Sequence, residues 1–408
     1  MATMGSCGPT APVRCAIATE ETPNNSMACC PKDARTVVSL FCHASNSNRN
    51  TSSLPSVSRV SPTKLTTAPH PFVLSLVSRS FGFRTTGASS TNTVPDMVRA
   101  REAHHSNLTP PWRCMAETPF PSEPITVMGA GLSGLAAAIV LAKAGKDVHV
   151  HDIRADSGAR FDGDFQALEN WSMDEDFFDQ LEAWGFDATS FKSTAFSVVD
   201  LIHPDDEITQ AKSDGVAYRI VERGTSEHTI DQAFKRMAIE AGATLHYKSR
   251  ISQKDANIVA CGPKDTSAIA LGEIFHTTHP NHIAFQLNDK LAPGAYSYLI
   301  IIDGVGLICT CLWRKQKKSD RFLNETIACY QRLYPDIDIH PIKRVGGKGD
   351  FTLNGNYTDP ATGQHYVGES GGLQDFMWGF GMRMAVWSGV LAAEEILGGK
   401  SYDKQVRR

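Results

Sequence analysis

Several features that would narrow the class of this protein are missing from its 408 residues. No stretch holds eighteen consecutive apolar residues, so we expect no transmembrane helix, and only a peripheral membrane contact stays compatible with the sequence. The formal net charge is −4, which implies no polyanionic partner and argues against nucleic acid. The 14 histidines and 10 cysteines do not fall at metal-ligand spacings, so we expect no metal site.

Acidic residues are scarce near the N-terminus, where only Glu20, Glu21 and Asp33 occur before residue 96. Residues 1–120 are rich in Ser, Thr, Asn, Ala and Pro and lack hydrophobic periodicity, so we expect a disordered tail. Scattered arginines in such a segment are typical of an organelle transit peptide for a plastid or mitochondrion. An untargeted tail on a cytoplasmic protein, or a wrongly assigned start codon, is the alternative.

A glycine motif between a short strand and a helix is the most informative stretch. The apolar residues 125–128 predict a buried strand, Gly129-x-Gly131-x-x-Gly134 follows, and residues 135–144 predict a helix. Gly129 permits a tight turn, Gly131 lets the backbone approach a pyrophosphate, and Gly134 lets the helix pack closely on the strand. The free amides and the positive dipole end of the helix would hold the phosphates.

An acid follows the next predicted strand. Residues 146–151 form that strand, which ends at Asp152, where a carboxylate can accept both ribose hydroxyls of an adenosine. Strand, glycine triplet, helix, strand and acid in this order predict a dinucleotide site. A glycine-rich turn met by chance is the alternative.

From about residue 121 the chain is long enough for a two-lobed enzyme. Apolar residues at helical spacing predict helices over 174–184, 230–241, 320–333 and 380–397. Strand patterns cover 195–202, 216–221, 257–263, 295–302 and 306–312, and the last two should form a hairpin across Asp303-Gly304. Strands and helices alternate only at the two ends. This order predicts an α/β fold in which a smaller, β-rich domain is inserted into a nucleotide-binding domain.

Three separated blocks carry a resemblance to a known family. Gly129–Asp152, Asp255–Pro263 and Val367–Arg383 together resemble segments of the FAD-dependent oxidoreductases of the geranylgeranyl reductase and p-hydroxybenzoate hydroxylase fold group. The resemblance implies a Rossmann-like FAD domain of the glutathione-reductase type with an inserted, mainly antiparallel β substrate domain. The implied FAD domain comprises about 124–188, 223–265 and 345–400, and the substrate domain comprises about 189–222 and 266–344.

The same resemblance implies FAD as the cofactor. Glu369, which replaces the aspartate usual in the family, would bind the ribityl chain, and the helix that follows would point its N-terminus at the isoalloxazine. Arg160 would lie against the pyrophosphate or the adenosine, with a solvated loop arginine as the alternative. The implied cofactor-binding residues are Gly129, Ala130, Gly131, Leu132, Ser133, Gly134, Asp152, Ile153, Arg160, Gly262, Gly368, Glu369, Gly379, Gly381 and Met382. No second G-x-G-x-x-G occurs, so NAD(P)H as electron donor would bind only transiently.

Substrate-side residues depart from the family's isoprenoid reductases, which carry Y-x-W-x-F-P. Tyr296 matches, but Tyr298 replaces the tryptophan and Ile300-Ile301 replace Phe-Pro, which argues against a polyprenyl chain. An apolar cavity lined by Phe285, Tyr296, Tyr298, Phe376 and Trp378 is expected, with ordinary core packing as the alternative. Tyr296 is the candidate proton donor, and Trp378 is the candidate wall against the flavin ring or the substrate.

Two further side chains have competing interpretations. Asp231, with Thr229, resembles the family segment that returns the chain to the flavin domain, but helix capping alone would explain both residues. Arg383 would contact the cofactor or an acidic substrate group, or else pair with a surface acid.

The sequence thus favours an FAD-dependent oxidoreductase that reduces or dehydrogenates a carbon–carbon bond of a small or lipophilic substrate. A flavin-dependent monooxygenase using NAD(P)H and oxygen is the first alternative. A non-catalytic nucleotide-binding protein is the second. Substrate identity and oligomeric state are left open.

Overall fold

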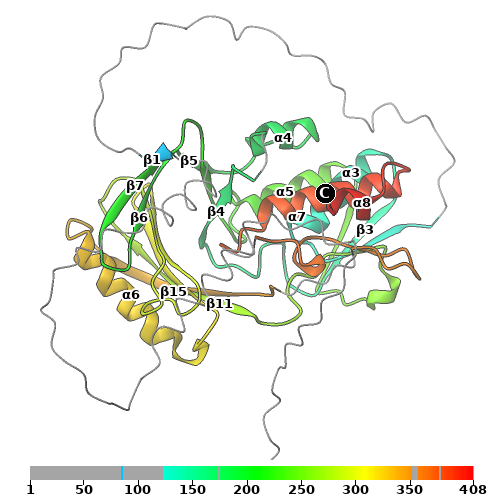
Figure 1. Ribbon diagram of the computed structural model, residues 1–408. Helices are drawn as coiled ribbons and strands as arrows, with labels where there is room; N and C mark the ends of the chain where they lie inside the picture. The colour runs from blue at the N-terminus through cyan, green and yellow to red at the C-terminus, as the bar shows by residue number, and fades with distance from the viewer. Residues whose placement is uncertain (1–83, 86–122, 173–174, 352–356, 376–377, 408) are drawn as a thin grey trace, which may run out of the picture. The chain divides into compact units, whose positions relative to one another are not determined.

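The computed structural model describes residues 84–85, 123–172, 175–351, 357–375 and 378–407 (Figure 1). They form three β-sheets with helices packed against them. Within these residues no helix is both long and apolar enough to cross a membrane.

A parallel five-stranded sheet carries the glycine motif. Its strands in spatial order are β16 (His365–Tyr366), β10 (Ile258–Val259), β2 (Ile125–Met128), β3 (Val148–Asp152) and β9 (Thr244–Tyr247). Three helices pack on it, namely α3 (Leu132–Lys143), α5 (Ile230–Glu240) and α7 (Met382–Ile396). The short helix α8 (Tyr402–Val406) packs on α7. The Rossmann-like half of the fold prediction is therefore confirmed.

Close approach of α3 and α7 explains the small residues of both helices, which lie side by side in Figure 1. Eleven of the twelve α3 residues are buried, as expected for a helix that is apolar on all sides. A Cβ on Gly389 of α7 would stand 2.2 Å from the carbonyl oxygen of Ser133. Only glycine therefore fits where the two helices touch.

An eight-stranded sheet forms the second layer. Its strands in spatial order are β1 (Arg84–Thr85), β7 (Ile208–Lys212), β6 (Val198–Ile202), β12 (His282–Gln286), β13 (Ser297–Ile302), β14 (Val305–Leu312), β11 (Ala268–His276) and β15 (His340–Gly349). All pairs are antiparallel except β6 with β12. The mainly antiparallel second half of the predicted fold is confirmed.

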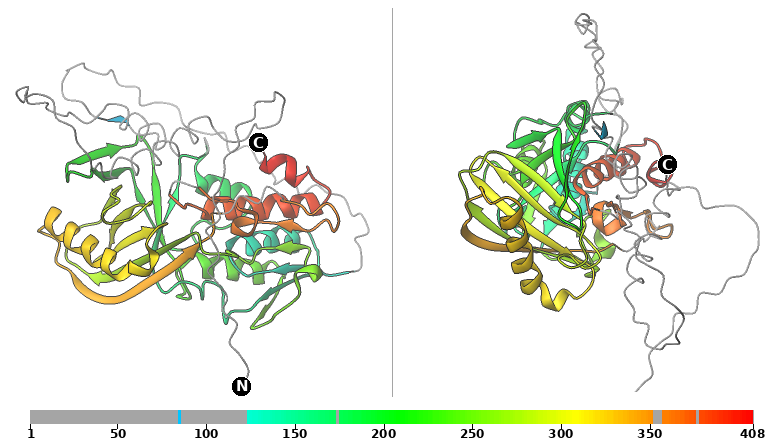
Figure 2. Two further views of the ribbon diagram at one scale, coloured as in Figure 1. Left: turned by 60° about the horizontal axis from the view of Figure 1, so that its bottom comes forward. Right: turned by 60° about the vertical axis from the view of Figure 1, so that its left-hand side comes forward.

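The predicted hairpin is present in this sheet. β13 and β14 are joined by Asp303 and Gly304, which both have positive φ (50° and 82°), the conformation that a two-residue hairpin turn requires. Helix α6 (Ser319–Leu333) covers one face of the sheet in both views of Figure 2. The opposite face carries Phe285 and Ile300, and Trp378, from the loop before α7, packs against it.

A third, three-stranded antiparallel sheet contains β4 (Phe165–Glu169), β8 (Tyr218–Glu222) and β5 (Ser193–Phe196). The prediction of one strand over 195–202 is wrong, because the chain bends at Ser197 and its halves join different sheets. β4 had no clear strand pattern in the sequence. Helix α4 (Phe177–Ala183) and the 3₁₀ turns η2 (Gln253–Asp255), η3 (Gln316–Lys318) and η4 (Gly368–Gly371) complete the described elements.

The third sheet joins β4, from the implied FAD domain, to β5 and β8, from the implied substrate domain, so those domain boundaries stay a prediction. Within the tail expected to be disordered, Arg84–Thr85 instead pair with β7 as an edge strand. The rest of residues 1–120, and with it the targeting hypothesis, lies outside the described residues.

Candidate active site

The three motif glycines have distinct environments at the end of β2. Gly129 has φ +115°, and a Cβ there would stand 2.3 Å from the carbonyl oxygen of Ala260. A Cβ on Gly134 would stand 2.0 Å from the carbonyl oxygen of Gly129. Beside Gly131, by contrast, no described heavy atom lies within 4 Å of the Cβ position. Gly129 and Gly134 are therefore demanded by packing, whereas Gly131 opens onto free space.

The first turn of α3 is suited to an anion. Its N-cap is Gly131, no side chain caps the helix, and no acidic residue stands in the first turn. The unpaired amides and the positive end of the helix dipole face this region without competition.

Asp152, at the end of β3, stands beside the glycine turn. Its Oδ2 accepts a hydrogen bond from the Ala130 amide and its Oδ1 accepts one from the Arg154 amide, both at 2.8 Å. These bonds fix the carboxylate, and each oxygen keeps a free lone pair for a further donor such as a ribose hydroxyl.

One cavity of about 330 Å³ connects this motif to an aromatic cluster. The predicted site residues that line it are Ala130, Gly131, Leu132, Ser133, Asp152, Arg160, Gly262, Tyr296, Glu369, Trp378, Gly379, Gly381 and Met382. Gly129, Gly134 and Gly368 shape the turns behind the wall, and Ile153 is 58% exposed beside it. We call Gly131, Leu132, Ser133 and Asp152 the nucleotide end of the cavity.

Arg160 is not a solvated loop arginine. Its Nη1 lies 2.9 Å from Oε2 of Glu369, and its Nη2 donates to the carbonyl of Lys348. Glu369 also accepts from the Asp350 amide through Oε1 at 3.0 Å. The two residues predicted to contact different parts of the cofactor therefore contact each other.

We call Phe285, Tyr296, Tyr298, Ile300 and Trp378 the aromatic end of the cavity. The Tyr296 hydroxyl donates to the Trp378 carbonyl, and the two ring centroids are 5.0 Å apart in an edge-on arrangement. Burial raises the pKa of both tyrosines well above the ordinary value. Both hydroxyls therefore stay protonated at neutral pH. Phe376, the fifth residue expected here, lies outside the described residues.

Two aromatic side chains of the cavity wall went unnoticed in the sequence. Trp313, at the end of β14, is 42% exposed and its ring centroid lies 5.2 Å from that of Phe351. Nothing in the local pattern marks them, because they become neighbours only when β14 and β15 pair on either side of β11.

The expectation for Arg383 is wrong. Its side chain is fully buried and does not line the cavity, and its Nη2 donates to the Glu175 carbonyl at 2.6 Å. Its Nη1 lies 3.4 Å from Oδ1 of Asn170. The first turn of α7 directs this guanidinium toward the segment before α4 instead of toward a ligand.

These elements define a class of fold, in which a Rossmann-like domain and an antiparallel sheet line one cavity. A family model described as an NAD(P)-binding Rossmann-like domain matches residues 127–164. A comparison of the sequence with curated proteins finds no match.

Several solved structures are similar to this chain in fold. A geranylgeranyl bacteriochlorophyll reductase-like protein from Thermoplasma acidophilum is 19% identical, with a TM-score of 0.55 over 70% of this chain and 81% of that chain. A flavoprotein/dehydrogenase from Cytophaga hutchinsonii is 15% identical, with a TM-score of 0.48 over 68% and 80%. The myxobacterial chondrochloren halogenase CndH, of the FAD-dependent halogenases, is 13% identical, with a TM-score of 0.49 over 69% and 76%. The chain therefore shares the fold of the geranylgeranyl bacteriochlorophyll reductase-like protein, as the sequence motifs implied.

Proposed function

We propose that this protein is an FAD-dependent oxidoreductase that reduces a carbon–carbon double bond of a small apolar or aromatic substrate, or catalyses the reverse dehydrogenation. The main support for this proposal is that Asp152 and Trp378 line the same continuous cavity. A dinucleotide that carries a redox-active ring is a ligand able to occupy both ends at once.

The residues present fit FAD. The Cβ position of Gly131 is open, the first-turn amides of α3 are unpaired by side chains, and Asp152 keeps acceptor capacity for a ribose. Glu369 lines the same cavity as the N-terminus of α7, at Met382, and would accept a ribityl hydroxyl. When bound, FAD supplies the hydride chemistry that no side chain here can perform.

The aromatic end supports an uncharged substrate. Among the described residues that form it, none carries a charge, and Phe285, Ile300 and Trp378 offer apolar surface. Burying an unpaired charge against this surface would be unfavourable, whereas an apolar or aromatic ring would be retained. The side chains here would orient the substrate and exclude water.

In the reduction, hydride would add to one carbon of the double bond, and a tyrosine would donate a proton to the other carbon. Tyr296, the candidate from the sequence, directs its hydroxyl to the Trp378 carbonyl, so it holds the loop that carries Trp378. Tyr298 lies on the same side of the sheet and also lines the cavity. We therefore place Tyr298 beside Tyr296 as a candidate donor, since its raised pKa keeps the hydroxyl protonated.

We also propose NAD(P)H as the electron donor. Hydroxylation of an aromatic substrate in the same cavity is the alternative to double-bond reduction. The aromatic end would accept a flat ring in either case. Oxygen use separates the two reactions, because hydroxylation consumes O₂ in proportion to product and double-bond reduction does not.

The direct test is purification followed by denaturation and analysis of the released chromophore. We expect a yellow protein that releases FAD and not FMN. A panel of apolar enones and phenols supplied with NADH or NADPH then reports product mass and oxygen consumption. A colourless protein that binds NAD but cannot be reconstituted with FAD would overturn the proposal in favour of a nicotinamide-dependent dehydrogenase.

A further inference from the structure

The end of strand β15 is held by two side chains of the cofactor cavity. Arg160 comes from the loop after β3, and Glu369 comes from η4. Arg160 donates to the carbonyl of Lys348 on β15, and Glu369 accepts from the amide of Asp350, one residue past the strand. The two side chains pair with each other at 2.9 Å. Three segments far apart in sequence thus meet at one ion pair.

This ion pair lies between the two ends of the cavity. η4 stands next to the nucleotide end, because a Cβ on Gly368 would be 2.9 Å from Oγ of Ser133. Phe351, two residues past β15, stands next to the loop that carries Trp378, because a Cβ on the following Gly379 would be 3.3 Å from its Cζ. Gly262 stands directly against the pair, 3.4 Å from Nη1 of Arg160 at its Cβ position.

We propose that Arg160 and Glu369 form a strap that couples FAD binding to the position of the β15 end, and through Phe351 to the loop that carries Trp378. This inference rests on the proposed cofactor. The side chains are only 26% and 16% exposed, so their attraction is less screened than that of a surface pair. Glu369 still has lone pairs for a cofactor hydroxyl, so the cofactor can bind onto the strap without breaking it.

The length of Glu369 is part of the proposal. Its two oxygens contact Arg160 and the Asp350 amide at the same time. An aspartate at this position would be one methylene shorter and could not keep both contacts with the backbone unmoved. Glu369→Asp therefore separates a strap from a simple hydroxyl acceptor, because it keeps the charge and removes the span.

The coupling is measurable as a double-mutant cycle on FAD affinity. Apoprotein of the wild type, Arg160→Met, Glu369→Gln and the double variant would be titrated with FAD, and the dissociation constant read from flavin fluorescence. We expect each single change to weaken binding by about tenfold, and the double variant to be no weaker than the worse single one. Glu369→Asp should behave like Glu369→Gln.

Arg344→Met is the matched control, since Arg344 also lies on β15 but pairs with Glu273 and Asp320 away from the cavity. Its FAD affinity should equal that of the wild type. If the double variant instead bound FAD about a hundredfold more weakly than the wild type, the effects of the two changes would be independent. That result would overturn the strap and mean that each residue contacts FAD separately. An unchanged affinity of Arg160→Met would overturn it as well.

A second measurement does not need flavin. The Lys348 side chain is exposed, and the peptide bond that follows it is a trypsin site at the end of the strand. Cleavage after Lys348 in the apoprotein should be faster in Arg160→Met and Glu369→Asp than in the wild type and Arg344→Met. Equal rates would contradict the strap. If the wild type binds no FAD but the cleavage rates differ as expected, Arg160 and Glu369 do hold the end of β15, whereas the coupling to FAD and the proposed function both fail.

Discussion

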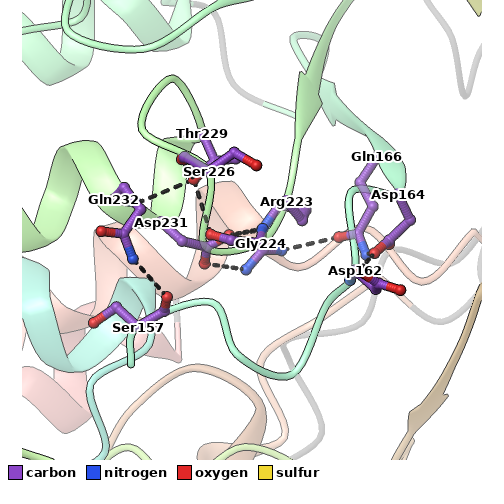
Figure 3. A network of polar contacts seen from close by, with 10 residues as sticks. All are labelled: Ser157, Asp162, Asp164, Gln166, Arg223, Gly224, Ser226, Thr229, Asp231 and Gln232. Atoms are coloured by element: carbon purple, nitrogen blue, oxygen red, sulfur yellow. Dashed lines mark hydrogen bonds and ion pairs between the residues drawn. The ribbon is translucent and has the colours of Figure 1, made fainter. Parts of the chain in front are cut away.

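Arg223 and Asp231 form a bidentate ion pair almost entirely out of solvent. Nε and Nη2 of the arginine each lie 2.8 Å from a different carboxylate oxygen, and the two side chains are 8% and 2% exposed. The third guanidinium nitrogen donates to Gln166 of β4 at 2.9 Å, as Figure 3 shows. The pair thus ties the end of β8 to the start of α5 and to the small sheet.

Asp231 does more than cap α5, which was one of the two interpretations of this residue from the sequence. Thr229 does cap α5, with its hydroxyl 3.3 Å from the Gln232 amide. Asp231 accepts in addition from the Gly224 amide at 3.0 Å, so its carboxylate closes the turn between β8 and α5. Both members of the ion pair also line the cavity.

Asp231→Asn should therefore be strongly destabilising. It leaves the Arg223 guanidinium buried without its charge partner, which costs about 3–5 kcal/mol in comparable sites. Urea unfolding would measure the loss of free energy. Glu325→Gln, in the exposed pair with Arg321, is the control and should change stability by less than about 0.5 kcal/mol. If Asp231→Asn changed the free energy of unfolding only slightly, the Arg223–Asp231 ion pair would contribute little to stability beyond the packing around it.

Gly131→Val and Gly134→Ala should fail in different ways. The Gly131 side-chain position is open, so the valine variant should fold but lose FAD binding, because it occupies the space beside the α3 amides. The Gly134 variant places a Cβ 2.0 Å from a backbone oxygen and should lose stability itself. Thermal melting and flavin titration on both variants distinguish the outcomes. A Gly131→Val protein that binds FAD normally would contradict this location of the phosphates.

Glu169→Gln should stabilise the protein in alkaline solution and not in acid. Burial raises the pKa of this carboxyl to about 7, so the folded state holds the proton more tightly than the unfolded chain. Stability is therefore lost as the pH rises from the ordinary glutamate value of about 4.5 to about 7. The variant removes a penalty of about 3 kcal/mol at pH 8 and nothing at pH 4. If the melting temperatures of the wild type and Glu169→Gln changed with pH in the same way, the raised pKa of Glu169 would be contradicted.

Trp378→Ala should keep FAD but lose turnover. The indole is 4% exposed and lies against Phe285 and Tyr296, with ring centroids 5.8 and 5.0 Å away. Its loss should cost about 3 kcal/mol of stability through a cavity, and at least about tenfold in turnover with a substrate identified from the panel of enones and phenols. Trp378→Phe is the control that keeps an aromatic wall. Unchanged turnover in the alanine variant would show that this loop does not bound the reaction site.

Local signals were enough for the parts of the fold that are specified over a few neighbouring residues. The glycine triplet, the strand before it and the acid at the end of the next strand each depend on backbone geometry within about 25 residues, and β2 matches its predicted range. The turn Asp303-Gly304 could be identified for the same reason, since its two residues must accept positive φ. Helices α5 and α6 begin and end within one residue of the prediction because apolar residues recur at helical spacing in both, and Thr229 also caps α5.

Contacts across the chain decided the rest. Ser197 carries no strong turn signal, and β5 separates from β6 only because their partners, β8 and β12, lie in different sheets. Arg160 and Glu369 are 209 positions apart, and no periodicity relates them. Arg383 follows the glycines of its motif, yet its guanidinium donates to the carbonyl of Glu175, before α4, and does not line the cavity. Sequence patterns indicate which side chains are apolar enough to be buried and which turns the backbone can form. The partner of a buried charge depends instead on how elements distant in the sequence pack together.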